Sequence, residues 1–190
     1  MKRICLLFLL VLSNLIHGQE NSRIPEILLQ DLDGQEVSTT SYFDGKAPVV
    51  FDFWATWCKP CLIKYETLKK LLPAWEKETG VRVIAVSIDA PERLQEVREL
   101  VGQSDWPLEV LLDPNQELFR RLNQGKNSVP RAFFFNNRGV LTAISAGVRL
   151  TTTPGEDLLT KMKEASPGEL EADLQDYYQK IKAAGTAKSE

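Results

Sequence analysis

The chain has 190 residues, of which 43% are hydrophobic, and its 23 basic and 26 acidic residues give a net charge of −3. This composition is typical of a globular protein and excludes a disordered or collagen-like chain. The charge gives no basic field that could hold nucleic acid through its phosphates. No apolar run reaches the roughly 18 residues of a membrane-spanning helix. The length suits one domain with a short extension.

The first eighteen residues have the layout of a secretory signal peptide. Lys2 and Arg3 precede the apolar run Ile4–Leu12, and a short polar segment follows that run. This order is typical of a cleaved signal, and we expect the cut after Gly18. The alternative is a short buried N-terminal helix. The signal predicts a periplasmic or secreted protein, with no membrane span in the mature chain.

Removal of this segment limits the chemistry that the chain can perform. The mature chain keeps 21 basic and 26 acidic residues, a net charge of −5, and loses Cys5 and His17. Without histidine, catalysis by Ser-His-Asp or Cys-His groups is excluded. Two cysteines, Cys58 and Cys61, are too few for a structural zinc site of four ligands. Leu62 stands where covalent haem attachment needs a histidine, so we expect no metal site and no cofactor.

The predicted elements alternate between strands and helices, as apolar and β-branched runs give way to apolar residues at helical spacing. In chain order they are a hairpin of strands 27–32 and 35–38, a strand at 46–54, a helix at 58–78, a strand at 81–88, a helix at 91–102, a strand at 108–112, a helix at 114–122 and a hairpin of strands 131–135 and 139–145. Pro73 is expected to bend the first helix.

The order of these elements predicts an α/β fold. Alternating strands and helices require a parallel central sheet, and the last two strands should be antiparallel at one edge. Two terminal helices are expected at 152–165 and 166–183, each opened by Thr or Ser, Pro and acidic residues. The chain therefore divides into the signal peptide 1–18, one domain at 19–165 and a C-terminal helical extension at 166–190.

The chemistry is concentrated in the motif Trp57-Cys58-Lys59-Pro60-Cys61. Two cysteines three residues apart at the start of a helix face the same way and lie close enough to form a disulfide. The helix N-terminus stabilises a thiolate, so Cys58 is predicted to be an exposed nucleophile. Cys61, one turn deeper, would attack Cys58 in a mixed disulfide and release the partner protein.

The other residues of the motif are expected to tune this chemistry. Pro60 costs no hydrogen bond in the first turn of a helix, where the backbone N–H has no partner. Lys59 places a cation beside the thiolate, and Trp57 forms a flat apolar wall beside the sulfur. The alternatives are a structural disulfide or half of a metal site. The position of the motif between a buried strand and a helix, in an exported chain without other cysteines, favours redox chemistry.

Three segments resemble the thioredoxin superfamily: VVFDFWATWCKPC at 49–61, VRVIAVSID at 81–89 and SVPRAFFFNNRGV at 128–140. The hairpin DLDGQEVS and the extra helix and strand between 91 and 112 are similar to the exported TlpA/ResA-like branch of thiol-disulfide oxidoreductases. The resemblance spans about residues 24–165. It implies a thioredoxin-like fold, in which a central mixed sheet is flanked by helices, with an N-terminal β-hairpin and an inserted helix-strand segment.

The resemblance also implies roles for single residues. Cys58 and Cys61 match the redox pair, and Pro130 matches the cis-proline that lies against it. The Val129 backbone would then be free to pair with an extended partner segment. Asp52 aligns with the buried acid that takes the proton of the second cysteine. The alternatives are an ordinary proline at the start of a strand and an acid turned toward water.

Several residues depart from the pattern of the family, which also has a helix-kinking proline where Glu66 stands. Asp52 stands where the TlpA/ResA-like branch often has asparagine, and Lys64 where that branch often has glutamate. Ala85 stands where thioredoxins have a lysine near the buried acid. Glu66 is expected to be a solvated helix acid that faces elsewhere. These departures leave the proton route open, although they do not affect the thiol pair.

The resemblance implies an enzyme that exchanges the Cys58–Cys61 dithiol or disulfide with cysteines of other exported proteins, mainly as a reductase. One target class is apocytochrome c, whose cysteines are reduced before haem attachment, and a membrane thiol carrier would donate the electrons. Three alternatives stay open: a disulfide-forming oxidase, a thiol peroxidase, and a binding module whose disulfide is structural. The Pro-x-x-x-Thr-x-x-Cys pattern of peroxiredoxins is absent before Cys58, which argues against the peroxidase.

Overall fold

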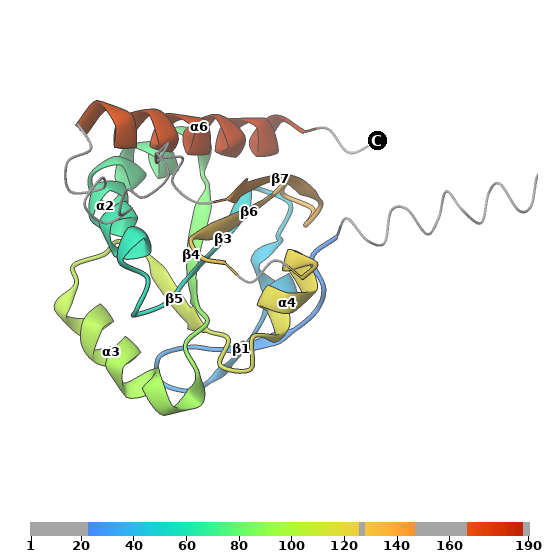
Figure 1. Cartoon of the computed structure of the whole chain (residues 1–190). Coiled ribbons are helices and arrows are strands. Elements are labelled where there is room, and N and C mark those ends of the chain that lie inside the picture. The colour runs from blue at the N-terminus through green and yellow to red at the C-terminus, as the bar shows by residue number, and fades with distance from the viewer. Residues whose placement is uncertain (1–22, 126–127, 147–166, 188–190) are drawn as a thin grey trace, which may run out of the picture.

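A computed structural model describes residues 23–125, 128–146 and 167–187. The predicted signal peptide 1–18 and the predicted helix 152–165 lie outside these residues. The strands are β1 Leu28–Gln30, β2 Glu36–Ser38, β3 Val49–Trp54, β4 Arg82–Ser87, β5 Glu109–Leu112, β6 Arg131–Phe135 and β7 Leu141–Ala146. The helices are α2 Lys59–Thr79, α3 Leu94–Gln103, α4 Glu117–Asn123 and α6 Pro167–Thr186, with short 3-10 helices η1 Thr39–Tyr42 and η2 Pro91–Arg93 (Figure 1).

A seven-stranded mixed sheet forms the centre, in the order β2-β1-β5-β4-β3-β6-β7. β3, β4 and β5 run parallel, and every residue of β3 is buried, as expected of a strand covered on both faces. β6 and β7 add antiparallel strands on one side, and the hairpin of β1 and β2 forms the opposite edge. The predicted α/β fold with a mixed sheet and an N-terminal hairpin is confirmed.

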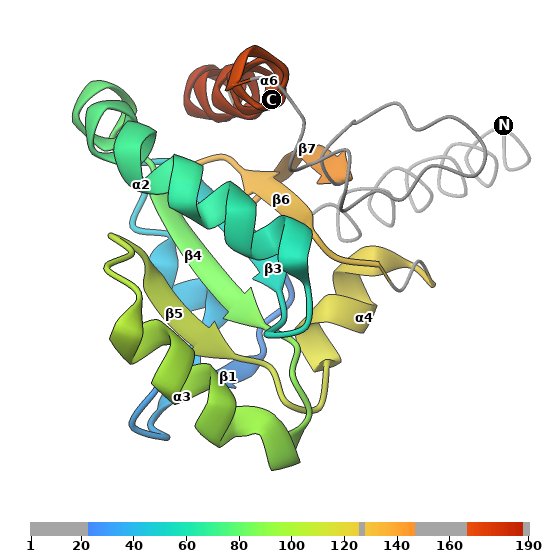
Figure 2. The same cartoon turned by 60° about the vertical axis from the view of Figure 1, so that its left-hand side comes forward.

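The helices cover the sheet as two layers. α2 crosses in front of β3 and β4 in Figure 2, and α3 lies in front of β5, as right-handed parallel crossovers require. α6 lies beside α2 in both views and contacts it (Figures 1 and 2). On the opposite face, Phe119 of α4 packs against Phe53 of β3, and Tyr42 of η1 packs against Phe51. No helix in the described part of the chain is long and apolar enough to cross a membrane.

Most predicted elements are present, with ends that differ by a few residues. α2 ends at Thr79 and is capped by Gly80, whose φ of 71° is the left-handed cap conformation that glycine adopts readily. The helix continues through Pro73. The short helix η1 is not predicted by the sequence, because the polar segment Thr39–Tyr42 has no apolar period. The helix predicted at 114–122 begins only at Glu117, since the buried Asp113 carboxylate accepts the backbone N–H groups of its first turn.

Candidate functional site

The site begins at the N-terminus of α2, where Cys58 is the capping residue. Its sulfur is bonded to that of Cys61, across a Cα–Cα distance of 5.3 Å. The Cys61 backbone N–H also donates to the Cys58 sulfur, at 3.3 Å. Pro60 lies in the first turn, as predicted. The helix start therefore directs the Cys61 N–H and the positive end of the helix dipole at the Cys58 sulfur.

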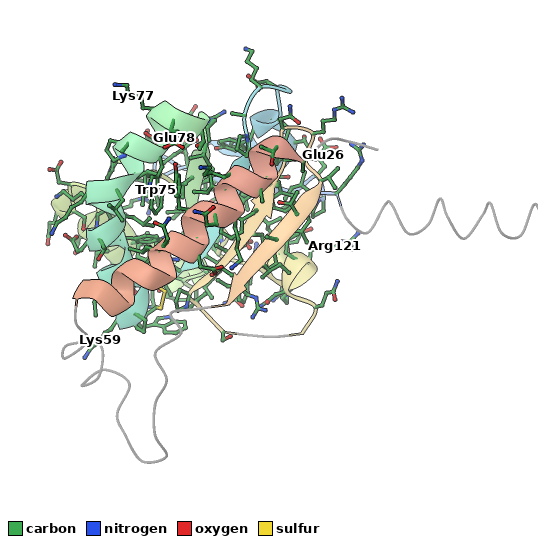
Figure 3. The ribbon with its side chains drawn as sticks, turned by 90° about the horizontal axis from the view of Figure 1, so that it is seen from above. Glu26, Lys59, Trp75, Lys77, Glu78 and Arg121 are labelled. Atoms are coloured by element: carbon green, nitrogen blue, oxygen red, sulfur yellow. A yellow bond between two sulfur atoms is a disulfide. The ribbon has the colours of Figure 1, made fainter. Side chains whose placement is uncertain are left out.

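The prediction of an exposed nucleophile is wrong for this disulfide form. Cys58 is only 3% exposed, although it is the more exposed of the two, and Cys61 is fully buried. In this form the Cys58 sulfur is bonded to that of Cys61 and accepts the Cys61 N–H, and these two bonds hold it at the helix end. Trp57 is 56% exposed beside it, and Lys59 points outward from the start of α2 (Figure 3). Trp57 therefore forms an exposed apolar surface directly before the disulfide.

The predicted cis-proline is present, as the Val129–Pro130 peptide bond is cis. Arg131, the next residue, begins β6 and pairs with Phe53 of β3. This register places Pro130 opposite Trp54, at the end of β3 from which the chain leads into the cysteine motif. Val129 is half-buried and packs against the core. The proline and the disulfide therefore lie at the same end of the sheet.

Asp52 is fully buried in the middle of β3, as the sequence predicted. The Lys64 ammonium lies 2.5 Å and 2.6 Å from its two carboxylate oxygens. The Tyr177 hydroxyl of α6 donates to the same carboxylate at 2.9 Å, and the Tyr65 hydroxyl donates to the Asp52 backbone carbonyl at 3.1 Å. Cys61 precedes Lys64 by one turn on the buried face of α2, so the residue that binds the carboxylate lies on the same helix face as the second cysteine.

Two opposing effects set the protonation of this carboxyl. Burial raises the pKa of Asp52 above its ordinary value, while the charge and hydrogen bonds of Lys64 and the hydroxyl of Tyr177 oppose that rise. Burial also raises the pKa of Tyr177 and of Tyr65 well above the ordinary value, and the charge of Asp52 adds to it. Both hydroxyls therefore stay protonated and act as donors at neutral pH.

Sequence reasoning missed two members of this cluster. Lys64 drew notice only as a departure from the family, and Tyr177 only as a residue of an amphipathic helix. The usable signal was the combination of Ala85, which leaves the buried acid without its usual lysine, and a lysine three residues after Cys61. No local pattern marks Tyr177, because 125 positions separate it from Asp52.

A second polar network holds the loop that carries the motif. Asp89, buried after β4, accepts the backbone N–H and the hydroxyl of Thr56 at 2.8 Å and 2.7 Å. The Ser87 hydroxyl donates to the same carboxylate, and Arg93 donates to the Thr56 hydroxyl. These bonds fix the backbone two residues before Cys58. Glu66, in contrast, is exposed on α2 and accepts the indole N–H of Trp106.

Other features of the described residues do not join this site. No group of three or more His, Cys, Asp or Glu side chains in the described ranges could hold a metal ion. A hollow of about 400 Å³ is lined by Pro25, Glu26, Ile27, Glu117, Arg120 and Arg121. Figure 3 shows Glu26 and Arg121 on the side of the molecule opposite Lys59, so this hollow is separate from the disulfide.

Comparisons with known proteins agree with this geometry. The sequence model of the AhpC/TSA family matches residues 21–144. The thiol-disulfide oxidoreductase ResA of Geobacillus thermodenitrificans is 28% identical over 146 residues, which cover 77% of this chain and 78% of that protein. A thioredoxin-like protein from Porphyromonas gingivalis has a similar structure, with a TM-score of 0.60, 28% identity and coverage of 85% of this chain and 94% of the other.

A second solved structure, described as a thiol:disulfide interchange protein DsbE from Chlorobium tepidum, gives a TM-score of 0.62 at 25% identity. The match covers 86% of this chain and 96% of that one. The chain belongs to the AhpC/TSA family and is a ResA/TlpA-like protein of the thioredoxin superfamily.

Proposed function

We propose that this protein is an exported thiol-disulfide oxidoreductase that exchanges its Cys58–Cys61 pair with cysteines of partner proteins. The observation that carries the proposal is the disulfide at the N-terminus of α2, at the sheet end that also carries the cis Val129–Pro130 bond. A structural disulfide would not need a helix start beneath its outer sulfur. The names of the relatives, thiol-disulfide oxidoreductase among them, support the same chemistry.

The reaction runs through a mixed disulfide. In the reductive direction, the Cys58 thiolate attacks a disulfide of the partner, and one partner sulfur leaves as a thiolate. Cys61 then loses its proton and attacks the Cys58 sulfur, which releases the second partner sulfur and re-forms the Cys58–Cys61 disulfide. Trp57 and the Val129 backbone would hold the partner, the latter by pairing with an extended segment. Asp52 would take the proton of Cys61.

The favoured direction is reduction of exported proteins, with the cysteines of apocytochrome c as one target class and a membrane thiol carrier as the electron donor. Similarity to a ResA protein supports this choice, and the layout of residues 1–18 supports export. A disulfide-forming oxidase is the competing function. The two differ in the reduction potential of the cysteine pair, because a more stable thiolate makes the disulfide more oxidising.

The test is the reduction potential of the Cys58–Cys61 pair, measured by equilibration with defined thiol buffers. A value near about −270 mV would support the reductase, and one near about −120 mV would show an oxidant instead. The variant with both cysteines replaced by serine is the control in a parallel assay of protein disulfide reduction. A disulfide that resists buffers far below both values, with no transfer to protein substrates, would contradict catalysis. Rapid turnover of hydrogen peroxide would point to the peroxidase.

A further inference from the structure

The C-terminal helix α6 contributes a side chain to the surroundings of the buried acid. Tyr177 is 2% exposed, and its hydroxyl lies 2.9 Å from an Asp52 carboxylate oxygen. Its ring packs edge-on against Phe134 of β6, with ring centres 4.8 Å apart, and stacks on Trp75 of α2 at 6.3 Å. Contacts on both sides therefore fix the hydroxyl where it meets the carboxylate.

Lys64 is the second residue whose side chain binds the Asp52 carboxylate. Its side chain is 8% exposed and that of Asp52 is 0% exposed, so the pair is shielded from water and from salt. The ammonium also lies 5.3 Å and 5.7 Å from the ring centres of Tyr65 and Tyr177, within the range of cation–π attraction. The lysine is therefore held by one carboxylate and two aromatic rings.

The titratable groups that face Asp52 in the described residues are few. α2 supplies Lys64 and Tyr65, and α6 supplies Tyr177. The neighbouring strands supply none at this level, because the residues paired with Asp52 are Ala85 of β4 and Ala132 of β6. Apart from burial itself, the charge state of Asp52 therefore depends mainly on one ammonium and one hydroxyl.

We propose that α6 is a working part of the redox site, and that Tyr177 and Lys64 are positioning residues that set the pH at which Asp52 exchanges a proton with Cys61. Both groups bind the ionised carboxylate. They belong to α2 and α6, so their contacts depend on how these helices pack and not on the residues next to Asp52 in β3. The proposal deepens the proposed function, on which it rests, because it assigns the proton route of the second cysteine. It also gives the C-terminal helix α6 a role in the proton transfer of the redox site.

The step in question can be written for a small thiol. When dithiothreitol reduces the disulfide, its thiolate bonds to the Cys58 sulfur and the Cys58–Cys61 bond breaks. Cys61 leaves with the electron pair of that bond and takes a proton from the Asp52 carboxyl. A second thiolate of dithiothreitol then frees Cys58 and closes the reagent into its cyclic disulfide. The first step is therefore fastest while Asp52 is protonated, and the rate per dithiothreitol thiolate should fall above the pKa of Asp52.

The experiment measures this pH profile in the full chain and in Tyr177→Phe, with Tyr178→Phe as the matched control. Tyr178 lies on the same helix and stacks on Trp75 at 5.0 Å, but its hydroxyl bonds to Glu78 rather than to Asp52. The side-chain carboxyl of Asp52 is titrated in the same proteins by carbon-13 NMR, with Asp52→Asn to assign its signal. Urea unfolding confirms that each variant is folded.

Tyr177→Phe should raise two values by about one pH unit: the midpoint of the pH profile of the reduction rate, and the midpoint of the NMR titration of Asp52. This is the size expected from a lost hydrogen bond to a charged group. Tyr178→Phe should match the parent chain. Lys64→Met should move both midpoints in the same direction and further, which tests the proposal even where Tyr177→Phe folds poorly. An unchanged midpoint in folded Tyr177→Phe, or an equal shift in Tyr178→Phe, would overturn the proposal.

These measurements are independent of any partner protein. A parent chain that fails to reduce protein disulfides, but whose Asp52 midpoint moves in Tyr177→Phe and not in Tyr178→Phe, would contradict the proposed function and support the role of α6. A parent chain that reduces protein disulfides, with the same Asp52 midpoint in all variants, would support the proposed function and contradict the role of α6. The two failures are therefore distinguishable.

Discussion

Removal of Lys64 should destabilise the protein strongly at neutral pH. Lys64→Met leaves the fully buried Asp52 carboxylate with one neutral donor in place of the ammonium that lies 2.5 Å and 2.6 Å from its oxygens. Breaking a buried ion pair by removing one partner costs about 3–5 kcal/mol. Such a loss is a large fraction of the 5–15 kcal/mol that stabilises an ordinary domain. Asp52→Asn should cost a similar amount, because it leaves the buried ammonium unpaired.

The double variant Asp52→Asn/Lys64→Met should recover most of this loss. No buried charge then remains, and the asparagine carbonyl can still accept the Tyr177 hydroxyl. In a double-mutant cycle, the sum of the two single-variant penalties should therefore exceed the penalty of the double variant by several kcal/mol. Urea unfolding of the disulfide form at pH 7 provides the four free energies. Additive penalties would refute the pairing.

The pH dependence of the free energy of unfolding gives a second check on Lys64→Met. Without Lys64, the pKa of Asp52 in the folded protein rises further above the value of about 3.9 in the unfolded chain. Between these two values the folded state binds more protons, so stability falls as pH rises through that window. The penalty of Lys64→Met should therefore be smallest near pH 4 and complete above the raised pKa. A penalty that does not change with pH would refute the reasoning.

Lys46→Met is the matched control for this series. Lys46 pairs with Asp44 on the surface, where the two side chains are 82% and 54% exposed. Exposed pairs contribute little to stability, because water and salt screen them. The urea midpoint should stay unchanged at both pH values. A loss as large as that of Lys64→Met would show that the method does not separate buried from exposed pairs.

Three further variants test the motif and its supports. Cys61→Ser should accumulate a stable mixed disulfide on Cys58 with a peptide disulfide, seen as a mass increase that Cys58→Ser lacks. Asp89→Ala should lose about 1–3 kcal/mol in urea unfolding and slow the exchange, since it leaves the partly buried N–H of Thr56 without its acceptor. Gly139→Ala should lower the melting temperature, because φ is +76° there and a Cβ would meet a neighbouring methyl group at 3.0 Å.

The fold was largely predictable because its signals are local and strong. The strand β3 is apolar at five of its six positions, and the helix after it begins with a motif that is itself a helix start. The positions of Cys58, Cys61 and Pro130 followed from motifs in the same way. Each of these residues takes its place through neighbours in sequence or through strand pairing.

The rest of the site could not be predicted, because it depends on contacts between distant parts of the chain. The sequence shows that residue 64 is a lysine but not that its long side chain turns inward to Asp52. The exposure of Cys58 was predicted wrongly for a similar reason, since the bonded sulfur is held at the helix end. Even the role of Asp89 depends on a loop 33 positions earlier.

The hydrogen bond between Tyr177 and Asp52 joins residues 125 positions apart, whereas the ion pair of Asp52 with Lys64 spans only 12. A ribosome makes the chain from its N-terminus, and domains begin to fold as they emerge. The ion pair can therefore form early in synthesis, while the hydroxyl arrives only with the final helix. Until then, Phe134 and Trp75 lack the aromatic ring that packs on them. The nascent protein thus has its cysteines long before Asp52 is fully enclosed.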